Sequence, residues 1–243
     1  MRGRTWLGST RIRPALPKQD VHQALDPRDP GYKGFKDYTP RFLKKYDQWV
    51  WFMAPRVWKT GAEPGLNLYR KHMGRRHLDI GPGTGYFIVE SRPPKNTHIT
   101  LLDPNPSVLE HCAETLAAWA PTMVRGNVLE PLPLEGPFDS AALVHVIHCL
   151  PGPMPAKARA IEHIAAVLTK DGVLFGGTVL GFSADHTRLA HIFLRVANFQ
   201  GAFDNRGDDV EGLRAMLEDS FEEAEVLIPS GSVAYFVASR PRR

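Results

Sequence analysis

Short apolar runs and amphipathic stretches alternate along the chain between residues 75 and 180. The apolar runs are rich in aliphatic and β-branched residues and predict five strands, over 75–80, 98–103, 122–126, 138–147 and 173–180. Between the runs, apolar residues recur at helical spacing, as in the stripe of Leu109, Cys112, Leu116 and Trp119. Strands and helices that alternate through right-handed crossovers predict a parallel sheet covered by helices on both faces.

A helix is predicted between the fourth and fifth strands, where Ile161, Ile164 and Leu168 form a stripe that ends at Gly172. After the fifth strand the alternation stops, and helices are predicted over 185–199 and 208–220. Two β-type runs then follow, over 222–228 and 232–239, with a proline and a glycine between them. Such a pair predicts an antiparallel hairpin. The expected fold is therefore α/β, with a seven-stranded, mostly parallel sheet that ends in this hairpin.

A helical cap is expected to precede the sheet. Thr39 and Pro40 have the form of an N-cap followed by proline at the first helical position. Phe42, Tyr46, Trp49 and Met53 then form one apolar stripe, Pro55 is expected to end or kink that helix, and a second helix is expected over 66–73. These features predict a single domain over 38–243, comprising a cap (38–74), a core (75–180), a helical insertion (181–221) and the hairpin (222–240).

Charge is concentrated at the two ends of the chain. The 243 residues carry a net charge of +4, but five basic residues precede the first acid, Asp20, so residues 20–243 carry −1. Residues 1–37 are therefore interpreted as a flexible basic arm, and a near-neutral body argues against a nucleic-acid partner. No apolar run approaches the roughly 20 residues that span a bilayer, and no secretory signal is recognisable, so the expectations are no membrane partner and a cytoplasmic location. Either a monomer or a homodimer is expected.

Three glycines at alternate positions follow the first predicted strand, in "DIGPGTGYF". Gly81, Gly83 and Gly85 come after Asp79, at the edge of the sheet where open α/β folds bind ligands. A phosphate-binding P-loop requires Lys and Ser or Thr after the last glycine, and here Tyr86 and Phe87 follow instead. The dinucleotide fingerprint has the spacing G-x-G-x-x-G, which this loop does not match.

The Asp-x-Gly-x-Gly-x-Gly pattern instead resembles motif I of class I S-adenosylmethionine-dependent methyltransferases of the small-molecule, natural-product type. The segments "LLDPNP", "RGNVLEPLP" and "FDSAALVHVIHCLPGP" resemble later motifs of that family, in the same order. The resemblance implies a Rossmann-like fold and S-adenosylmethionine as cofactor. It also implies a cofactor-binding set, which comprises Asp79, Gly81, Gly83, Gly85, Asp103, Asn127, Val128 and His145. Asp79 could either touch the cofactor or anchor the loop.

Two histidines near the end of the fourth strand are the candidate catalytic residues. Histidine takes up a proton near neutral pH, and His148 is favoured for acting on the acceptor, while His145 is favoured for lining the cofactor. The candidate substrate-binding residues come from the cap and the insertion and comprise Tyr46, Trp49, Trp58, Phe203 and Asn205. Aromatic density there favours a small flat acceptor, methylated at O, N or C, and no metal site is expected. A protein or RNA methyltransferase, a non-catalytic nucleoside-binding module and a nicotinamide oxidoreductase remain as alternatives.

Overall fold

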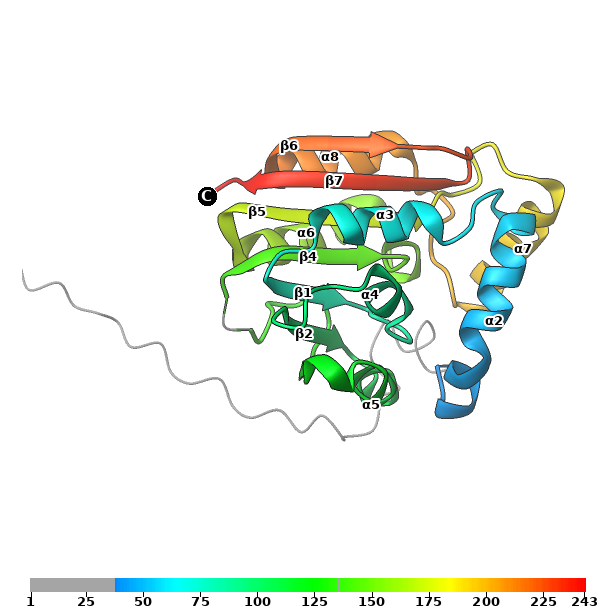
Figure 1. The fold of residues 1–243 in the computed structure, drawn as a ribbon. Coiled ribbons are helices and arrows are strands. Elements are labelled where there is room, and N and C mark those ends of the chain that lie inside the picture. The colour runs from blue at the N-terminus through cyan, green and yellow to red at the C-terminus, as the bar shows by residue number, and fades with distance from the viewer. Residues whose placement is uncertain (1–37, 135) are drawn as a thin grey trace, which may run out of the picture.

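The computed structural model describes residues 38–134 and 136–243, so the predicted basic arm, residues 1–37, lies outside the described residues. A seven-stranded sheet with the order β3-β2-β1-β4-β5-β7-β6 forms its centre (Figure 1). The strands are β1 (Arg76–Ile80), β2 (His98–Asp103), β3 (Thr122–Arg125), β4 (Phe138–Val144), β5 (Leu168–Val179), β6 (Phe221–Leu227) and β7 (Val233–Pro241). Only β7 runs against its neighbours, so the mostly parallel sheet with an antiparallel C-terminal hairpin is confirmed.

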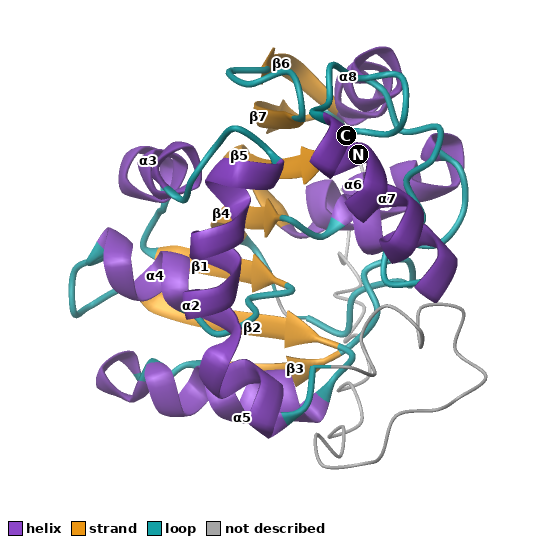
Figure 2. Cartoon of the chain, turned by 90° about the vertical axis from the view of Figure 1, so that its right-hand side faces the viewer, coloured by secondary structure: helices purple, strands orange, loops and turns teal. Residues whose placement is uncertain are grey.

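Helices cover both faces of the sheet, as predicted. The helices are α2 (Pro40–Val57), α3 (Glu63–His72), α4 (Tyr86–Ser91), α5 (Pro106–Thr115), α6 (Met154–Val167), α7 (Arg188–Gln200) and α8 (Val210–Ser220). In the view along the strands, α3, α4 and α5 lie on one side of the sheet and α6 and α8 on the other (Figure 2). The helices α2 and α7 lie in front of the carboxyl ends of the strands, where they form the cap. No helix in the described part of the chain is long and apolar enough to cross a membrane.

Local sequence signals account for where several helices begin. The Thr39 hydroxyl accepts a hydrogen bond from the N–H of Phe42, and Asn105 caps α5 in the same way through the N–H of Ser107. Both caps are followed by proline, whose fixed φ suits the first helical turn. The apolar sequence of β4 follows from its position in the interior of the sheet, where every residue of the strand except Asp139 is buried. A strand buried on both faces is expected to be continuously apolar in this way.

Two predicted boundaries were wrong. The helix was expected to include Leu168 and to end at Gly172, but α6 ends at Val167 and β5 begins at Leu168, which pairs with Phe138. Leu168 is buried in the core as the first residue of β5, although its spacing from Ile164 is that of a helix. The fourth strand ends at Val144 rather than at residue 147 because His145 has a φ of +61°, which an extended strand does not allow. Of the two effects expected of Pro55, an end or a kink, the structure excludes the first at that residue, because α2 continues to Val57.

Successive strands are added to the sheet in one direction from β1 to β3 and in the opposite direction from β4 onward, so the strand order reverses between β1 and β4. Ligands of open α/β sheets bind at the carboxyl ends of the strands beside such a switch point. The glycine loop follows β1, and the two candidate histidines follow β4. The fold therefore brings the two most distinctive sequence features to one place.

Candidate active site

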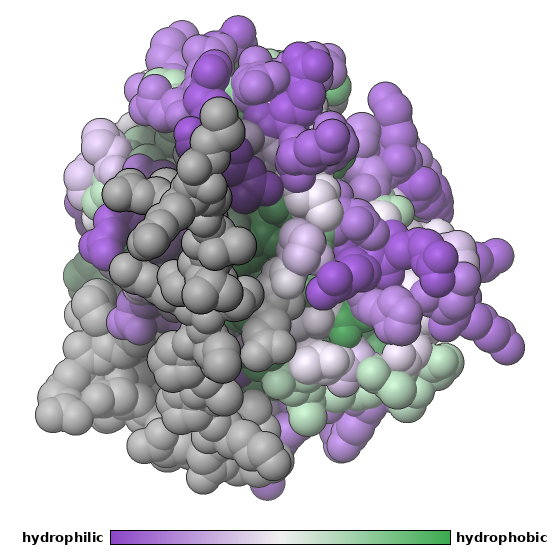
Figure 3. All heavy atoms as spheres, turned by 90° about the vertical axis from the view of Figure 1, so that its left-hand side faces the viewer, coloured by the Kyte–Doolittle hydropathy of each residue, from purple (hydrophilic) through white to green (hydrophobic). Residues whose placement is uncertain are grey.

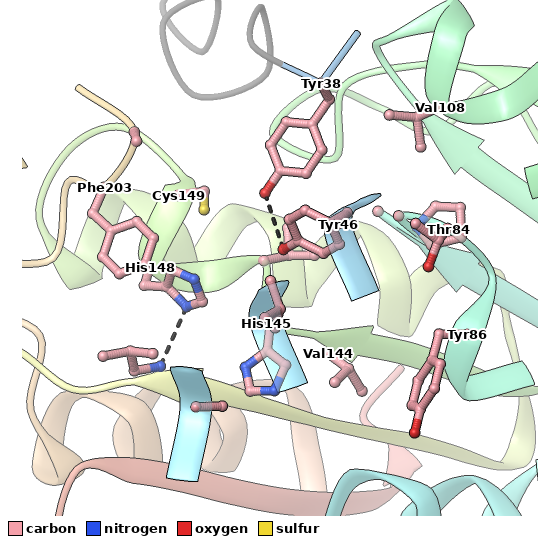
Figure 4. Close-up of a pocket in the computed structure, with 18 of the residues that line it drawn as sticks. Tyr38, Tyr46, Thr84, Tyr86, Val108, Val144, His145, His148, Cys149 and Phe203 are labelled. Carbon is pink, nitrogen blue, oxygen red and sulfur yellow. Dashed lines mark hydrogen bonds between the residues drawn. The ribbon is translucent and has the colours of Figure 1, made fainter. Parts of the chain in front are cut away.

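A cavity of about 610 Å³ lies between the carboxyl ends of the strands and the α2–α7 cap. This volume is within the range of pockets that hold cofactors and small ligands. One end is lined by the glycine loop and by residues that follow β2 and β3, and the other end by aromatic side chains of α2, α7 and the loop after α7. We call these the loop end and the aromatic chamber; Figure 4 shows residues of both.

The glycine loop presents bare backbone to the cavity at Gly83. All three loop glycines have positive φ, between 59° and 80°. A Cβ atom on Gly81 would lie 2.6 Å from Val146 Cγ2, and one on Gly85 would lie 3.0 Å from Cys112 Sγ, so both glycines are needed for close packing. A Cβ atom on Gly83 would meet no atom within 4 Å. Gly81 and Gly83 line the cavity, and only Gly83 borders open space at that point.

Asp79 is an anchor beneath the loop rather than part of the cavity wall. It is 1% exposed, and its Oδ2 accepts a hydrogen bond of 2.7 Å from the Tyr69 hydroxyl. His77 Nε2 lies 3.4 Å from the same oxygen. Of the two roles that the sequence left open for Asp79, the contacts favour the indirect one.

The residues after β2 and β3 form the rest of the loop end. Asp103 ends β2, lines the cavity and accepts a hydrogen bond of 2.7 Å from the N–H of Asn105. Burial raises the pKa of Asp103 to about 7, and the Asn105 N–H opposes part of that rise. Asn127 and Val128 also line the cavity. The Asn127 Oδ1 accepts from the Leu129 N–H, which leaves one oxygen lone pair for another donor.

A hydrogen bond between side chains joins the cap to the glycine loop. Thr84, between the second and third loop glycines, donates from its hydroxyl to Asp47 Oδ1 on α2 over 2.8 Å. Burial raises the pKa of Asp47, while the Thr84 hydroxyl opposes the rise. Sequence reasoning missed this pair, because nothing in the helical pattern of α2 relates Asp47 to a loop 37 residues away.

His145 stands immediately after β4 with left-handed backbone. Its N–H donates to the Gly177 carbonyl over 2.7 Å, which fixes the backbone there. Its ring lines the cavity, packs near Phe87 and Tyr235, and has no hydrogen-bond partner among the described residues. Burial lowers the pKa of His145 to about 4, so the ring is neutral at physiological pH and can accept a proton. Non-glycine residues held at positive φ are often found at functional sites.

His148 is buried and has a fixed orientation. Its Nδ1 accepts a hydrogen bond of 3.2 Å from the Val179 N–H, drawn in Figure 4, and lies 3.3 Å from the Thr178 hydroxyl. Burial, followed by the positive charges that His145 and Lys157 can carry, lowers the pKa of His148. A neutral ring that accepts at Nδ1 carries its proton on Nε2. His148 is therefore arranged as a hydrogen-bond donor, whereas the sequence favoured it as the group that takes a proton.

Four of the five predicted acceptor residues line the aromatic chamber. Tyr46, Trp49, Trp58 and Phe203 all border the cavity. The ring centroids of Phe203 and His148 lie 4.3 Å apart, and Figure 4 shows these two side chains next to each other. Asn205 does not. It is fully buried, and its amide donates to the Val179 and Leu180 carbonyls, so it holds the loop after α7 rather than facing an acceptor.

Other chamber residues were not named as sites from the sequence. They include Tyr38, Cys149, Phe193 and Tyr235. Tyr38 and Tyr46 face each other with their hydroxyls 3.4 Å apart, and burial raises the pKa of Tyr46 to about 12. Phe193 packs against Trp58 and Phe203. The one available signal was that Phe193 belongs to the aromatic insertion that the sequence associates with specificity.

A buried ion pair supports the wall of the chamber. Lys157 on α6 donates from Nζ to Asp208 Oδ2 over 2.6 Å and to the Asp204 carbonyl over 2.7 Å, and its side chain is fully buried. Asp204 in turn donates from its N–H to the His148 carbonyl and accepts from the Gly152 N–H. The segment that carries Phe203 is thus fastened both to α6 and to the end of β4.

Replacing Lys157 with methionine is expected to destabilise the fold by about 3–5 kcal/mol, because Asp208 is left as a buried carboxylate without its cation. Urea denaturation of the Lys157→Met variant measures this change. Lys170 pairs with Asp171 on the surface, so the Lys170→Met control should unfold like the wild type. A change below about 1 kcal/mol for Lys157→Met would show that the pair does not hold this segment.

Comparison with known proteins decides the family. Residues 78–174 match the model of a methyltransferase domain. Over 191 residues, covering 77% of this chain and 83% of the other, the sequence is 37% identical to demethylluteothin O-methyltransferase of Streptomyces thioluteus. The chain belongs to the S-adenosylmethionine-dependent methyltransferases. This methyltransferase is also 33% identical, over 88% of its length and 97% of the other, to the physcion biosynthesis cluster O-methyltransferase of Aspergillus chevalieri.

Solved structures show the same fold. The N-methyltransferase NodS of Bradyrhizobium japonicum, in complex with S-adenosylhomocysteine, superimposes with a TM-score of 0.54 at 15% identity, covering 74% of this methyltransferase and 85% of NodS. The expected class I fold and S-adenosylmethionine as cofactor are confirmed. The loop end fits that cofactor. Gly83 leaves room where a side chain would intrude, and Asp103 offers a carboxylate at the position that binds ribose hydroxyls in folds of this kind.

The described residues that line the cavity include no lysine or arginine. No group of three histidine, cysteine or acidic side chains in the described ranges is arranged to hold a metal ion. The polar side chains of the lining include two histidines, tyrosine and threonine hydroxyls, the Cys149 thiol, two side-chain amides and the carboxyls of Asp47 and Asp103.

Proposed function

We propose that this methyltransferase methylates a hydroxyl oxygen of a small, planar aromatic or enolic metabolite. The observation that carries the proposal is His145, a neutral imidazole without a hydrogen-bond partner among the described residues, at the boundary between the loop end and the aromatic chamber. A hydroxyl must lose its proton as it is methylated, and the unpartnered ring nitrogen of a neutral imidazole can accept that proton. The names of the two relatives, both O-methyltransferases of natural-product pathways, also support the proposal.

The protein's own contribution is to hold two reactants in line and to accept one proton. Gly81, Gly83 and Asp103 would hold the cofactor, and Asn127 and Val128 would contact its adenine ring. When bound, the cofactor supplies an electrophilic methyl group on a sulfonium, whose carbon–sulfur bond breaks as the acceptor oxygen bonds to the methyl carbon. His145 takes the hydroxyl proton and becomes an imidazolium. Alignment of this kind contributes about 7–11 kcal/mol in favourable cases, and a general base adds roughly 10²–10⁴-fold.

The aromatic chamber would select the acceptor. Trp58 and Phe203 stack at 6.5 Å with an angle of 25° between their planes, and Phe193 packs against both, so a flat ring has apolar surfaces to contact. His148 would donate from Nε2 to an acceptor oxygen, because its Nδ1 is already occupied.

Replacing His148 with phenylalanine is expected to raise KM for the acceptor roughly tenfold, because one hydrogen bond of about 1.4 kcal/mol is lost. The pH profile of kcat should keep its shape, since another residue accepts the proton. Steady-state kinetics of His148→Phe and wild-type protein across a pH range measure both quantities. A lost or displaced acid limb in this variant would instead identify His148 as the base.

The direct test of the proposal is transfer of a deuterated methyl group from labelled S-adenosylmethionine. Phenolic and enolic compounds, the corresponding aromatic amines, a peptide mixture and RNA are offered separately, and products are identified by mass spectrometry. We expect labelled methyl ethers. Labelled amines alone would move the proposal to nitrogen, and labelled peptide or RNA alone would overturn it.

A further inference from the structure

The outer surface of the cap combines exposed apolar side chains with basic ones. On α7, the exposed apolar residues are Leu189, Ile192, Val196 and Phe199, and on α2 they are Phe42, Trp49 and Phe52. Phe199 is 88% exposed and Ile192 59%, which is unusual for side chains of this size. We call these seven side chains the cap patch. The two helices lie next to each other, since Trp49 packs near Phe193, and both face the viewer in Figure 2.

The exposed charges on the two helices of the cap patch, α2 and α7, have one sign. The exposed charged residues on these two helices are Arg41, Lys44, Lys45, Arg56, Arg188 and Arg195. The only acidic residue of either helix is Asp47, which is partly buried and accepts from Thr84. At 100° per residue, Arg188 and Arg195 lie along one side of the apolar stripe on α7. On α2, Arg56 lies 3.9 Å above the ring of Phe52.

The cap patch continues into the cavity. Phe42, Trp49 and Val196 belong to it and also line the aromatic chamber. On the opposite side of the molecule, at the amino ends of the parallel strands, hydrophilic side chains predominate in the described part (Figure 3). The cap patch is therefore continuous with the apolar lining of the aromatic chamber.

We propose that the cap patch binds the surface of an anionic lipid bilayer. Helices with bulky apolar side chains on one side and only Lys or Arg as exposed charges lie in the interfacial region of membranes, where anionic headgroups attract the cations. Self-association through the same two helices is disfavoured, because it would bring their basic side chains together and neither helix carries an exposed carboxylate to pair with them. A bilayer also holds dissolved apolar molecules, so the entrance to an apolar chamber would face their reservoir. This differs from the sequence-based expectation of no membrane partner.

Vesicle co-sedimentation of the full-length protein tests the proposal. The vesicles contain either phosphatidylcholine alone or phosphatidylcholine with phosphatidylserine. We expect binding to the anionic vesicles that weakens with salt, and weaker binding to the neutral ones. The double variant Ile192→Ser with Phe199→Ser should lose roughly tenfold or more in affinity, and Arg188→Gln with Arg195→Gln a similar amount. None of these four residues lines the cavity.

The matched control is Leu227→Ser with Ile228→Ser, which removes two exposed apolar side chains at the end of β6. It should bind the vesicles like the wild type. Unchanged thermal melting and S-adenosylhomocysteine affinity show that each variant is folded. Three results would overturn the proposal: no vesicle binding, equal binding by wild type and the Ile192–Phe199 variant, or a dimer in light scattering that the same variant dissociates.

Discussion

Replacing His145 with asparagine is expected to lower kcat by roughly 10²–10⁴-fold, because the acceptor proton loses its base. Asparagine is the appropriate replacement, since it tolerates positive φ better than other non-glycine residues and should preserve the backbone at the end of β4. Affinity for S-adenosylhomocysteine should change little. Single-turnover kinetics measure the loss, and calorimetry measures the affinity. Replacement of the exposed His98, at the start of β2, by asparagine provides the control and should leave both unchanged.

The pH dependence of the same reaction tests the same role. Burial lowers the pKa of His145 to about 4, and only the neutral ring can accept a proton. The rate should therefore be maintained at neutral pH and fall as the pH decreases through about 4, provided that the fold persists there. A wild-type rate in His145→Asn, or an acid limb that the substitution does not remove, would show that the proton leaves by another route.

Replacing Gly83 with leucine is expected to weaken S-adenosylhomocysteine binding roughly 100-fold or more. A Cβ atom at Gly83 meets nothing in the protein, so the added side chain would occupy the space that the cofactor needs. A leucine at a φ of +59° also costs about 1–2 kcal/mol of stability. Isothermal titration calorimetry measures the affinity, and urea denaturation measures the stability.

The Gly231→Leu variant is a control that distinguishes backbone strain from obstruction of the cofactor site. Gly231 has a φ of +79° but does not line the cavity. This control should lose at least as much stability, because its Cβ atom would also lie 3.1 Å from Asp185 Cβ, and should keep its affinity for S-adenosylhomocysteine. Equal affinities for the Gly83 variant and the wild type would contradict the assignment of the glycine loop.

The sheet and the glycine loop could be predicted because both depend on local pattern. Strands such as β2 and β4 are short apolar runs, and the three loop glycines follow the first strand at the edge of the sheet where ligands were expected to bind. Leu168 shows where that reasoning fails. Its spacing from Ile164 suited a helix, but pairing with Phe138 across the sheet decided its conformation.

The roles of the two histidines could not be predicted, because each depends on residues distant in sequence. The proton on His148 is fixed by the N–H of Val179, 31 residues away. The direction of His145 is fixed by a positive φ and by the Gly177 carbonyl. The burial of Asn205 likewise follows from carbonyls at the end of β5. Residue type and order placed these residues near the site correctly. Their separate roles, His145 as proton acceptor, His148 as hydrogen-bond donor and Asn205 as a structural residue, depend on tertiary contacts.

A crystal structure of the protein with S-adenosylhomocysteine tests the central claim most directly, because it locates the sulfur relative to both ends of the cavity. The account predicts ribose hydroxyls on Asp103, the ligand over Gly83 and the sulfur directed toward the aromatic chamber, with His145 beside it. A ligand bound with its sulfur turned away from His145 and the chamber would contradict it.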